Sequence, residues 1–283
     1  HGQNFLVDLN LIELLADAAQ LTRDDVVLEV GTGTGSLTGL LAAKAAHVVT
    51  VEIDEHLHQL AQEELEEQEN ITFLHQDALK NKNHFHPLVL DSIKKQMDAY
   101  PGAIFKLAAN LPYNVATPII SNLLRCSILP ESMTVTIQKE LADRLVAEPH
   151  SKDYGALSVW AQSLCDVKVV RVLPPTVFWP RPKVDSAIVH LVHRPDKRSQ
   201  IPDIDFFHTF TRRIFFHRRK FLRSVAISAF KNLLNKEEVD QVLQRHHLGP
   251  QARTEQLDVG FLQELCESFR QKLLENGAAE FDV

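Results

Sequence analysis

The stretch Val26-Val-Leu-Glu-Val-Gly-Thr-Gly-Thr-Gly35 decides how this chain of 283 residues folds. Its first half is a short apolar run, which is typical of a strand buried inside a parallel sheet. The glycines that follow let the backbone approach a ligand closely, and they leave the amide groups of the next helix free to bind it. We therefore interpret the stretch as the first strand, turn and helix start of an α/β fold that binds a ligand at the turn.

Strand and helix patterns alternate through the first two thirds of the chain. Six more runs have the length and composition of strands, and helical spacing separates several of them. The seven predicted strands cover residues 26–30, 47–51, 71–75, 104–109, 133–137, 167–172 and 186–191. This alternation predicts a Rossmann-like α/β fold, in which a mostly parallel, seven-stranded sheet carries helices on both faces.

The composition changes near Arg194-Pro195, and apolar residues then recur at helical spacing without a convincing strand. The predicted helices of this part cover residues 205–234, 236–246 and 259–276. A chain of this length holds one large and one smaller domain. We expect a sheet domain over residues 1–195 and a small all-α domain over residues 196–283.

The bulk composition excludes several classes of protein. Hydrophobic residues make up 45% and charged residues 24% of the chain, which is ordinary for a globular protein. No apolar run approaches the ~18 residues that span a bilayer, and no signal peptide is visible, so we expect a cytoplasmic monomer without a membrane partner. Cys126, Cys165 and Cys266 are scattered, which indicates a reducing compartment and no metal site.

A carboxylate ends the second predicted strand, because Glu52 stands 21 residues after Gly31. An acidic side chain at this place can accept hydrogen bonds from the ribose hydroxyls of an adenosine-containing cofactor. The glycine turn and Glu52 are therefore compatible with both NAD and S-adenosylmethionine.

Three further features favour S-adenosylmethionine. Glu29 precedes the glycines, where a carboxylate orients the turn or attracts a cationic cofactor but repels the pyrophosphate of a dinucleotide. The glycines are spaced Gly-X-Gly-X-Gly, whereas dinucleotide-binding turns read Gly-X-Gly-X-X-Gly. Asp77-Ala78 ends the third predicted strand, where the carboxylate can accept from an adenine amino group. These groups follow successive strands, at whose carboxyl ends ligands of such sheets bind.

The fourth predicted strand runs into Asn110-Leu-Pro-Tyr113. This tetrapeptide offers an amide oxygen and backbone carbonyls as acceptors for a planar amine, and it offers a ring for stacking. Pro112 fixes the turn and lacks a competing N–H group. The combination suits methyl transfer to the exocyclic nitrogen of a nucleic-acid base.

Positive charge is concentrated in one part of a chain whose formal net charge is −7. Residues 194–231 contain ten Lys or Arg and three Asp residues, and no acidic residue interrupts residues 212–223. On a continuous helix the cations of this run share one side and apolar residues the other, which indicates phosphate contact. A solvated charged face is the alternative interpretation. The expected RNA-binding residues are Arg212, Arg213, Arg219, Lys220 and Arg223.

These motifs together resemble those of the rRNA adenine N6-dimethyltransferase family, the KsgA group, over nearly the whole chain. Residues 2–6 are similar to its N-terminal motif, and residues 218–220 match a basic signature of its C-terminal domain. Residues 178–186 look like the motif that supplies a second aromatic ring to the target pocket. The resemblance implies that the catalytic residues are Asn110, Leu111, Pro112, Tyr113 and Phe178. It implies cofactor contacts by Gln3, Asn4, Leu6, Glu29, Gly31, Gly33, Gly35, Glu52, Ile53, Asp77, Ala78 and Asn110.

The resemblance further implies a class I methyltransferase that uses S-adenosyl-L-methionine and no metal. Its expected substrate is small-subunit (16S) rRNA, free or in a pre-ribosomal particle, in which two adjacent adenosines of a 3′-terminal hairpin become N6,N6-dimethyladenosine. Three alternatives stay open: an erythromycin-resistance type of enzyme on large-subunit rRNA, a non-catalytic ribosome-assembly or transcription factor, and an NAD-dependent oxidoreductase.

Overall fold

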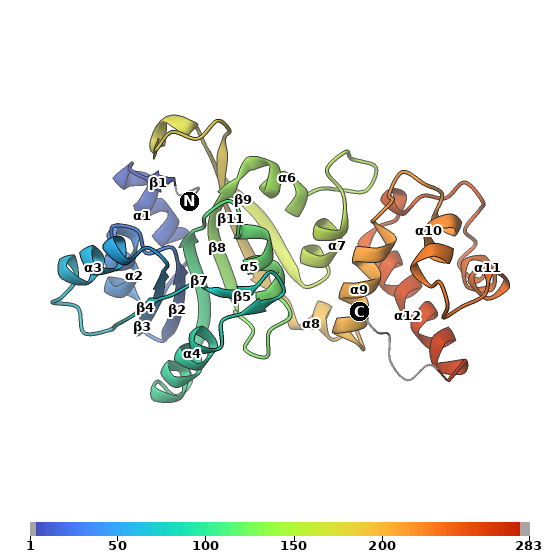
Figure 1. Ribbon diagram of the computed structural model, residues 1–283, viewed down its shortest axis with the longest axis horizontal. Coiled ribbons are helices and arrows are strands. Elements are labelled where there is room, and N and C mark those ends of the chain that lie inside the picture. Colours follow the sequence, from blue (N-terminus) through green and yellow to red (C-terminus); the bar gives the residue numbers. More distant parts are fainter. Residues whose placement is uncertain (1–3, 278–283) are drawn as a thin grey trace. The chain divides into compact units, whose positions relative to one another are not determined.

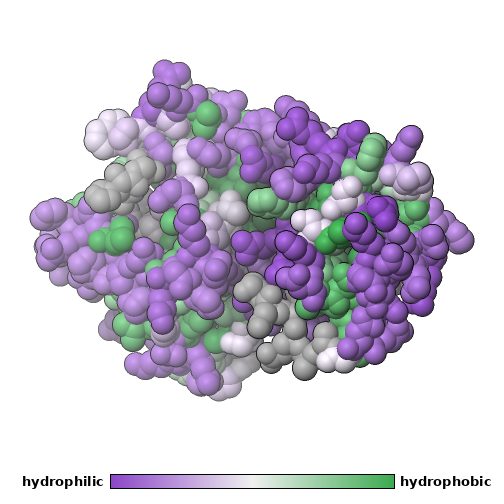
Figure 2. All heavy atoms as spheres, turned by 45° about the vertical axis from the view of Figure 1, so that its right-hand side comes forward, coloured by the Kyte–Doolittle hydropathy of each residue, from purple (hydrophilic) through white to green (hydrophobic). Residues whose placement is uncertain are grey.

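The computed structural model describes residues 4–277, which form two compact units (Figure 1). The sheet unit holds the residues up to Ala142 together with Val167–His193. The helical unit holds Asp143–Asp166 together with the residues from Arg194 onward. No helix among the described residues is long and apolar enough to cross a membrane, and hydrophilic residues cover most of the face shown in Figure 2.

Seven strands form the main sheet in the order β4-β3-β2-β7-β8-β11-β9. Neighbours from β4 to β8 pair in parallel, and β11 pairs antiparallel with β8. The strands are β2 Asp25–Val30, β3 His47–Glu52, β4 Ile71–His75, β7 Ile104–Asn110, β8 Ser132–Gln138, β9 Cys165–Leu173 and β11 Ser186–His193. All seven predicted strands and the Rossmann-like fold class are therefore confirmed.

Helices cover both faces of this sheet (Figure 1). Those that lie wholly in the sheet unit are α1 Leu9–Ala18, α2 Ser36–Lys44, α3 Glu55–Glu64, α4 Pro87–Ala99 and α5 Ala116–Leu123, and α6 Lys139–Leu145 follows β8. Leu15 of α1 and Leu41 of α2 are fully buried in one cluster with Val27, Val48 and Ala108 of the strands. Each large apolar side chain buried in this way contributes about 1.5–3 kcal/mol.

Two short pairs of strands, which the sequence did not predict, flank the main sheet. β1 Phe5–Leu6 pairs antiparallel with β10 Phe178–Trp179, which follows the 3-10 helix Pro175–Val177, and β5 Leu79–Asn81 pairs with β6 His84–Phe85. The register of the first pair sets Leu6 opposite Phe178. Segments separated by more than 170 residues are thereby joined beside the sheet.

The helical unit is built around aromatic rings. Its helices are α7 Ala156–Gln162, α8 Pro195–Arg198, α9 Ile204–Ile214, α10 Leu222–Ala229, α11 Lys236–Arg245 and α12 Val259–Glu275, with the 3-10 helix Thr254–Gln256. Phe230 and Phe269 stack with ring centroids 4.4 Å apart, and Phe210 lies 6.3 Å and 6.1 Å from these two rings. Offset ring pairs of this kind add to the stability that burial alone supplies.

One predicted helix is wrong in extent, because residues 205–234 form two helices instead of one. α9 ends at Ile214, and α10 begins at Leu222. Between them the chain bonds to distant segments: Arg218 Nη1 donates to the Tyr154 carbonyl over 2.7 Å, and Leu222 N donates to the Ala252 carbonyl over 2.7 Å. These tertiary hydrogen bonds replace helical ones, and a local pattern cannot reveal them.

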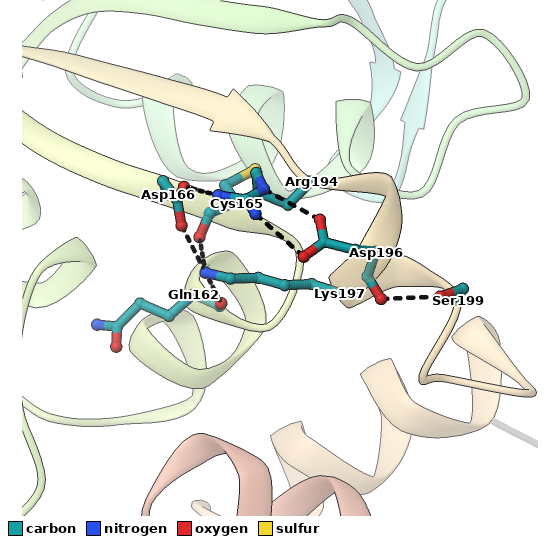
Figure 3. Close-up of polar contacts among 7 residues, drawn as sticks. All are labelled: Gln162, Cys165, Asp166, Arg194, Asp196, Lys197 and Ser199. Carbon is teal, nitrogen blue, oxygen red and sulfur yellow. Dashed lines mark hydrogen bonds and ion pairs between the residues drawn. The ribbon is translucent and has the colours of Figure 1, made fainter.

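A cluster of ion pairs ties residues 162–166 to residues 194–199 within the helical unit (Figure 3). Asp166 pairs with Arg194 and, over 2.8 Å, with the Lys197 ammonium, which also donates to the Cys165 carbonyl. Arg194 binds Asp196 as well, over 3.0 Å. These bonds are one reason why Asp143–Asp166 groups with the helices, whereas our expected boundary after residue 195 assigned this segment to the sheet domain.

Candidate active site

A pocket of about 860 Å³, measured with its open mouth, lies at the carboxyl ends of β2, β3, β4 and β7. This is the edge at which doubly wound sheets bind ligands, and the size suits a small organic cofactor. The lining residues are Asn4, Phe5, Val30, Gly31, Gly33, Val51, Glu52, Ile53, Gln76, Asp77, Ala78, Leu79, Asn110, Pro112, Asn114, Val115 and Ile119.

The glycine turn forms one wall of this pocket. Gly31 has a φ of +88° and Gly33 a φ of +57°, and residues other than glycine rarely adopt such backbone angles. A Cβ atom at Gly33 would lie 3.3 Å from the Phe5 ring, which is tighter than ordinary contact. Glycine is therefore required at residue 33 for two reasons, the backbone angle and the close approach of the N-terminal segment.

Glu52 is held rigidly at the end of β3. Its Oε2 atom accepts from the Gly33 amide over 2.9 Å, and its Oε1 atom accepts from the Ile53 and Asp54 amides over 3.0 Å each. The side chain is buried, yet it lines the pocket. The carboxylate thus joins the glycine turn to β3 and presents a fixed acceptor to a ligand.

Glu29 does not line the pocket and lies in the core beside the turn. Its Oε2 atom accepts from the Thr38 and Thr50 hydroxyls over 2.6 Å each, and the Thr50 hydroxyl lies 2.6 Å from that of Thr32 in the turn. Burial raises the pKa of Glu29 to about 8, although the two threonine hydrogen bonds oppose the shift. Of the two roles that we considered, these contacts fit orientation of the turn better than attraction of a cation.

The segment after β4 supplies further polar groups to the pocket. Asp77 accepts from the Leu79 amide over 2.8 Å through its Oδ1 atom. Gln76, which is not among the expected cofactor residues, lines the pocket with a buried Nε2 atom that has no hydrogen-bond partner among the described residues. An unpartnered buried donor costs about 1–3 kcal/mol, so this atom indicates that a ligand with an acceptor belongs here. The signal in the sequence was the stretch Gln76-Asp-Ala78, which resembles the adenine-binding motif of the family.

Asn110 reaches the pocket from the end of β7. Its Nδ2 atom donates to the Asn4 carbonyl over 3.0 Å. A carbonyl can only accept, so this bond fixes the nitrogen toward Asn4 and leaves Oδ1 as the acceptor for another group. Pro112 also lines the pocket, whereas Leu111 is buried and its amide donates to the Thr136 carbonyl over 3.1 Å.

The two expected stacking rings lie outside this pocket. Tyr113 is half-buried, and its hydroxyl is hydrogen-bonded to the Ser186 hydroxyl; burial raises its pKa, and this hydrogen bond opposes the shift. Phe178 is 3% exposed and packs with Leu6 in the cluster beneath α1 and α2. Gly35 is likewise away from the pocket, at the start of α2, and Gln3 lies outside the described residues.

Comparison with known proteins identifies the family. The family model described as ribosomal RNA adenine dimethylase matches residues 1–271. This chain belongs to the ribosomal RNA adenine dimethylase family. The ribosomal RNA small subunit methyltransferase A of Oceanobacillus iheyensis is 37% identical over 272 residues, which are 95% of this chain and 89% of that protein. The protein of the same name from Listeria innocua is 39% identical over 91% of this chain and 85% of its own length.

Solved structures agree on the fold of this chain. A dimethyladenosine transferase from Plasmodium falciparum has a TM-score of 0.77 at 24% identity, with 95% of this chain and 98% of that chain covered. The 23S rRNA methyltransferase ErmE has a TM-score of 0.65 at 25% identity, with 94% and 100% covered. Both likenesses extend over nearly the whole chain, and they support the Rossmann-like methyltransferase fold.

Apolar residues outside the expected set complete the lining of the pocket. They are Phe5, Val30, Val51, Leu79, Val115 and Ile119, with Asn114 as a further polar group. Val30 and Val51 belong to strands whose apolar runs look alike from end to end. A single sequence carries no signal that distinguishes their pocket-facing members from the core.

The five expected RNA-binding residues do not share one helical face, since the helix ends at Ile214. Arg212, Arg219 and Lys220 are exposed, and Arg213 donates to the Ala229 carbonyl over 3.1 Å. Arg223 binds both carboxylate oxygens of Asp240, over 2.6 Å and 2.8 Å. No acidic residue interrupts this run in the sequence, but the fold brings Asp240 of α11 to Arg223.

Proposed function

We propose that this protein transfers methyl groups from S-adenosylmethionine to N6 of two adjacent adenosines in a 3′-terminal hairpin of small-subunit rRNA, forming N6,N6-dimethyladenosine. One observation carries the proposal: Asn110 is held by Asn4 so that its amide oxygen is the free acceptor in a pocket that Glu52 and Asp77 also line. Membership of the dimethylase family and the names of the relatives support it.

The pocket residues fit S-adenosylmethionine. Glu52 and Asp77 are acceptors for ribose hydroxyls and for the adenine amino group, and the unpartnered Gln76 Nε2 is a donor for an adenine nitrogen. The cofactor, when bound, supplies a methyl group that its sulfonium already activates. We infer that the chain therefore needs neither a metal nor a covalent intermediate, and that its residues act on the amine.

Asn110 and the following backbone prepare the amine for attack. Hydrogen bonds from the adenine N6–H groups to Asn110 Oδ1 and to a carbonyl of residues 111–112 favour a pyramidal nitrogen with its lone pair aimed at the methyl carbon. The Pro112 carbonyl already accepts from the Val115 amide over 3.1 Å, and its second lone pair can accept again. Most of the acceleration then comes from positioning and from electrostatic preorganisation.

The target adenosine must leave its stack to reach this site. Tyr113, half-buried and fixed through Ser186, is the ring on which the extruded base stacks, worth roughly 1–3 kcal/mol. Phe178 can provide the second ring only if the β1–β10 pair leaves its packed position, because 3% of its surface is exposed. Exposed cations of the segment from Arg212 to Arg223 contact the phosphates.

The proposal extends to the setting of the reaction. We expect the protein to act as a monomer in the cytoplasm, on free rRNA or on an assembling small subunit, and to take part in small-subunit biogenesis.

The variant Asn110→Ala tests the mechanism. We expect methylation of small-subunit rRNA to fall at least about 100-fold, while the Kd for S-adenosylmethionine changes only a few-fold, because the lost acceptor acts on the amine. Asn83→Ala, which removes an exposed amide that does not line the pocket, is the matched control and should retain most activity. Turnover is measured by mass spectrometry of rRNA after incubation with labelled cofactor.

Two outcomes would contradict the proposal. Unchanged turnover of Asn110→Ala would rule out this role of the amide. Primer extension on both rRNAs locates the modified bases, and methylation confined to large-subunit rRNA would replace the substrate with that of the erythromycin-resistance type.

A further inference from the structure

A groove in the helical unit lies between α9 and α10 and is separate from the cofactor pocket. It has a volume of about 1100 Å³, measured with its open side. Thr209 of α9 and Val225 of α10 are buried at its base, and the exposed side chains of Arg212, Phe216 and Lys231 stand around them. The remaining lining residues are Arg213, His217, Ser228 and Ala229.

The charge of this groove selects a negatively charged ligand. Arg212, Arg213 and Lys231 line it, and no Asp or Glu is among its described lining residues. Arg213 is engaged with the Ala229 carbonyl, over 3.1 Å, and both residues line the groove. Arg223 and Asp240, which neutralise each other, do not line it. No described carboxylate that lines the groove therefore neutralises its positive charge, whereas Asp240 neutralises the charge of Arg223.

Phe216 distinguishes this groove from a simple phosphate site. Its side chain is 79% exposed, more than any other large hydrophobic side chain of the described residues, and the His217 ring meets it edge-on with centroids 4.7 Å apart. Leaving a phenylalanine in water forgoes about 1.5–3 kcal/mol of burial. A flat apolar ring beside cations matches the two parts of a nucleotide, since bases stack on rings and phosphates bind Arg and Lys.

We propose that the α9–α10 groove binds one unpaired nucleotide of the rRNA substrate, with its base stacked on Phe216 and its phosphate held by Arg212 and Lys231. The inference rests on the proposed rRNA methyl transfer and adds a second site at which the protein grips the same RNA. An acidic protein segment would use the cations but would gain little from the exposed ring, so the ring favours RNA.

The test measures the binding of the full chain to two probes, one that carries bases and one that lacks them. The probes are a fluorescent single-stranded oligoadenylate of about ten nucleotides and an abasic ribose-phosphate chain of equal length. For Phe216→Ala we expect roughly tenfold weaker binding of the oligoadenylate and unchanged binding of the abasic chain, since only the base stacks. Leu274→Ala removes another exposed apolar side chain of the helical unit, from α12, and should change neither.

The salt dependence separates the cations from the ring. Arg212→Ala and Lys231→Ala should each reduce the slope of log Ka against log salt concentration by about one, for both probes. Phe216→Ala should leave the slope unchanged, as should Lys236→Ala, which removes an exposed cation outside the groove.

Several results would overturn the inference. One is that Phe216→Ala and the unaltered protein bind the oligoadenylate with equal affinity. Another is that Phe216→Ala weakens the binding of both probes to the same extent. A third is that polyglutamate displaces both probes and binds with an affinity equal to theirs. Methylation of rRNA is measured alongside, where we expect Phe216→Ala to raise KM and leave kcat unchanged. If the unaltered protein methylates rRNA and Phe216→Ala has the same KM, the proposal about the groove alone is refuted. If the unaltered protein methylates no rRNA, the proposed function is refuted.

Discussion

Glu29 is a carboxyl group that the fold keeps from water at the end of β2, next to the glycine turn. Its Oε2 atom receives two threonine hydroxyls, and its Oε1 atom has no partner among the described residues. Burial is the largest cause of a pKa raised to about 8, so the group is mainly protonated at neutral pH. The buried neutral acid links the turn to β3 without placing an uncompensated charge in the core.

The variant Glu29→Gln tests this protonation. The native state holds a proton that the unfolded chain releases above a pKa of about 4.3, so stability falls as the pH rises from about 5 to 8. Glutamine keeps the shape and cannot ionise. We expect equal stability of both proteins near pH 5, and near pH 9 a variant more stable by on the order of 3 kcal/mol. Urea unfolding at several pH values measures the difference.

Glu63→Gln, at an exposed residue of α3, provides the control for the loss of one negative charge. It should not change the slope of stability against pH. If Glu29→Gln follows the unaltered protein across the whole pH range, Glu29 ionises normally and the hydroxyl network holds a carboxylate.

The turn between α9 and α10 gives two neighbouring arginines opposite roles. Arg218 donates to the Tyr154 carbonyl and lies 3.8 Å from Glu255, whereas Arg219 is exposed. We expect Arg218→Ala to lose about 1–2 kcal/mol of stability, because a charged donor to a buried carbonyl is removed. Arg219→Ala should change stability by less than about 0.5 kcal/mol and weaken RNA binding instead.

Thermal unfolding and salt-dependent RNA binding distinguish the two variants. Similar melting temperatures for both would show that Arg218 does not fasten the turn. Arg218→Lys serves as a second control, since an ammonium restores the charge without the geometry of the guanidinium.

The sequence predicts the strands of the sheet but not the turn between α9 and α10, and the reason is physical. A strand buried on both faces is apolar along its length, as in Val26–Val30, so the sequence alone predicts it. The segment 215–221 has a helical pattern too, but the chain there forms hydrogen bonds to Tyr154 and Ala252, far away in the sequence, in place of helical ones. Local patterns contain no record of such partners.

The candidate site divides in the same way. Glu52, Asp77 and Asn110 follow strands at a common edge, and the fold brings them to one pocket as their spacing predicts. Phe178 depends on the β1–β10 pair, whose two-residue strands are too short to leave a pattern. The structure therefore places this ring in the core, and only the register of that pair explains why.

The chain passes between the two compact units three times, since it leaves the sheet unit after Ala142, returns at Val167 and leaves again after His193. The segment Asp143–Asp166 contributes Trp160, whose side chain is 2% exposed and whose ring lies 4.7 Å from the His208 ring and 6.2 Å from the Phe207 ring of α9. The helical unit consequently contains residues from both sides of the boundary that the composition suggested.

A fragment of residues 1–195 tests which unit this segment needs. The fragment lacks α9, so we expect Trp160 to become exposed and its fluorescence to shift to the red relative to the full chain. The substitution Trp179→Phe in both proteins removes the other tryptophan, which is 67% exposed and would mask the change. An unshifted spectrum with cooperative unfolding of the fragment would mean that residues 143–166 pack on the sheet by themselves, and a division after residue 195 would then describe the independently folding parts. A red shift would mean that residues 143–166 need the rest of the helical unit. The helical domain would then be completed by a segment that precedes the last two strands of the sheet.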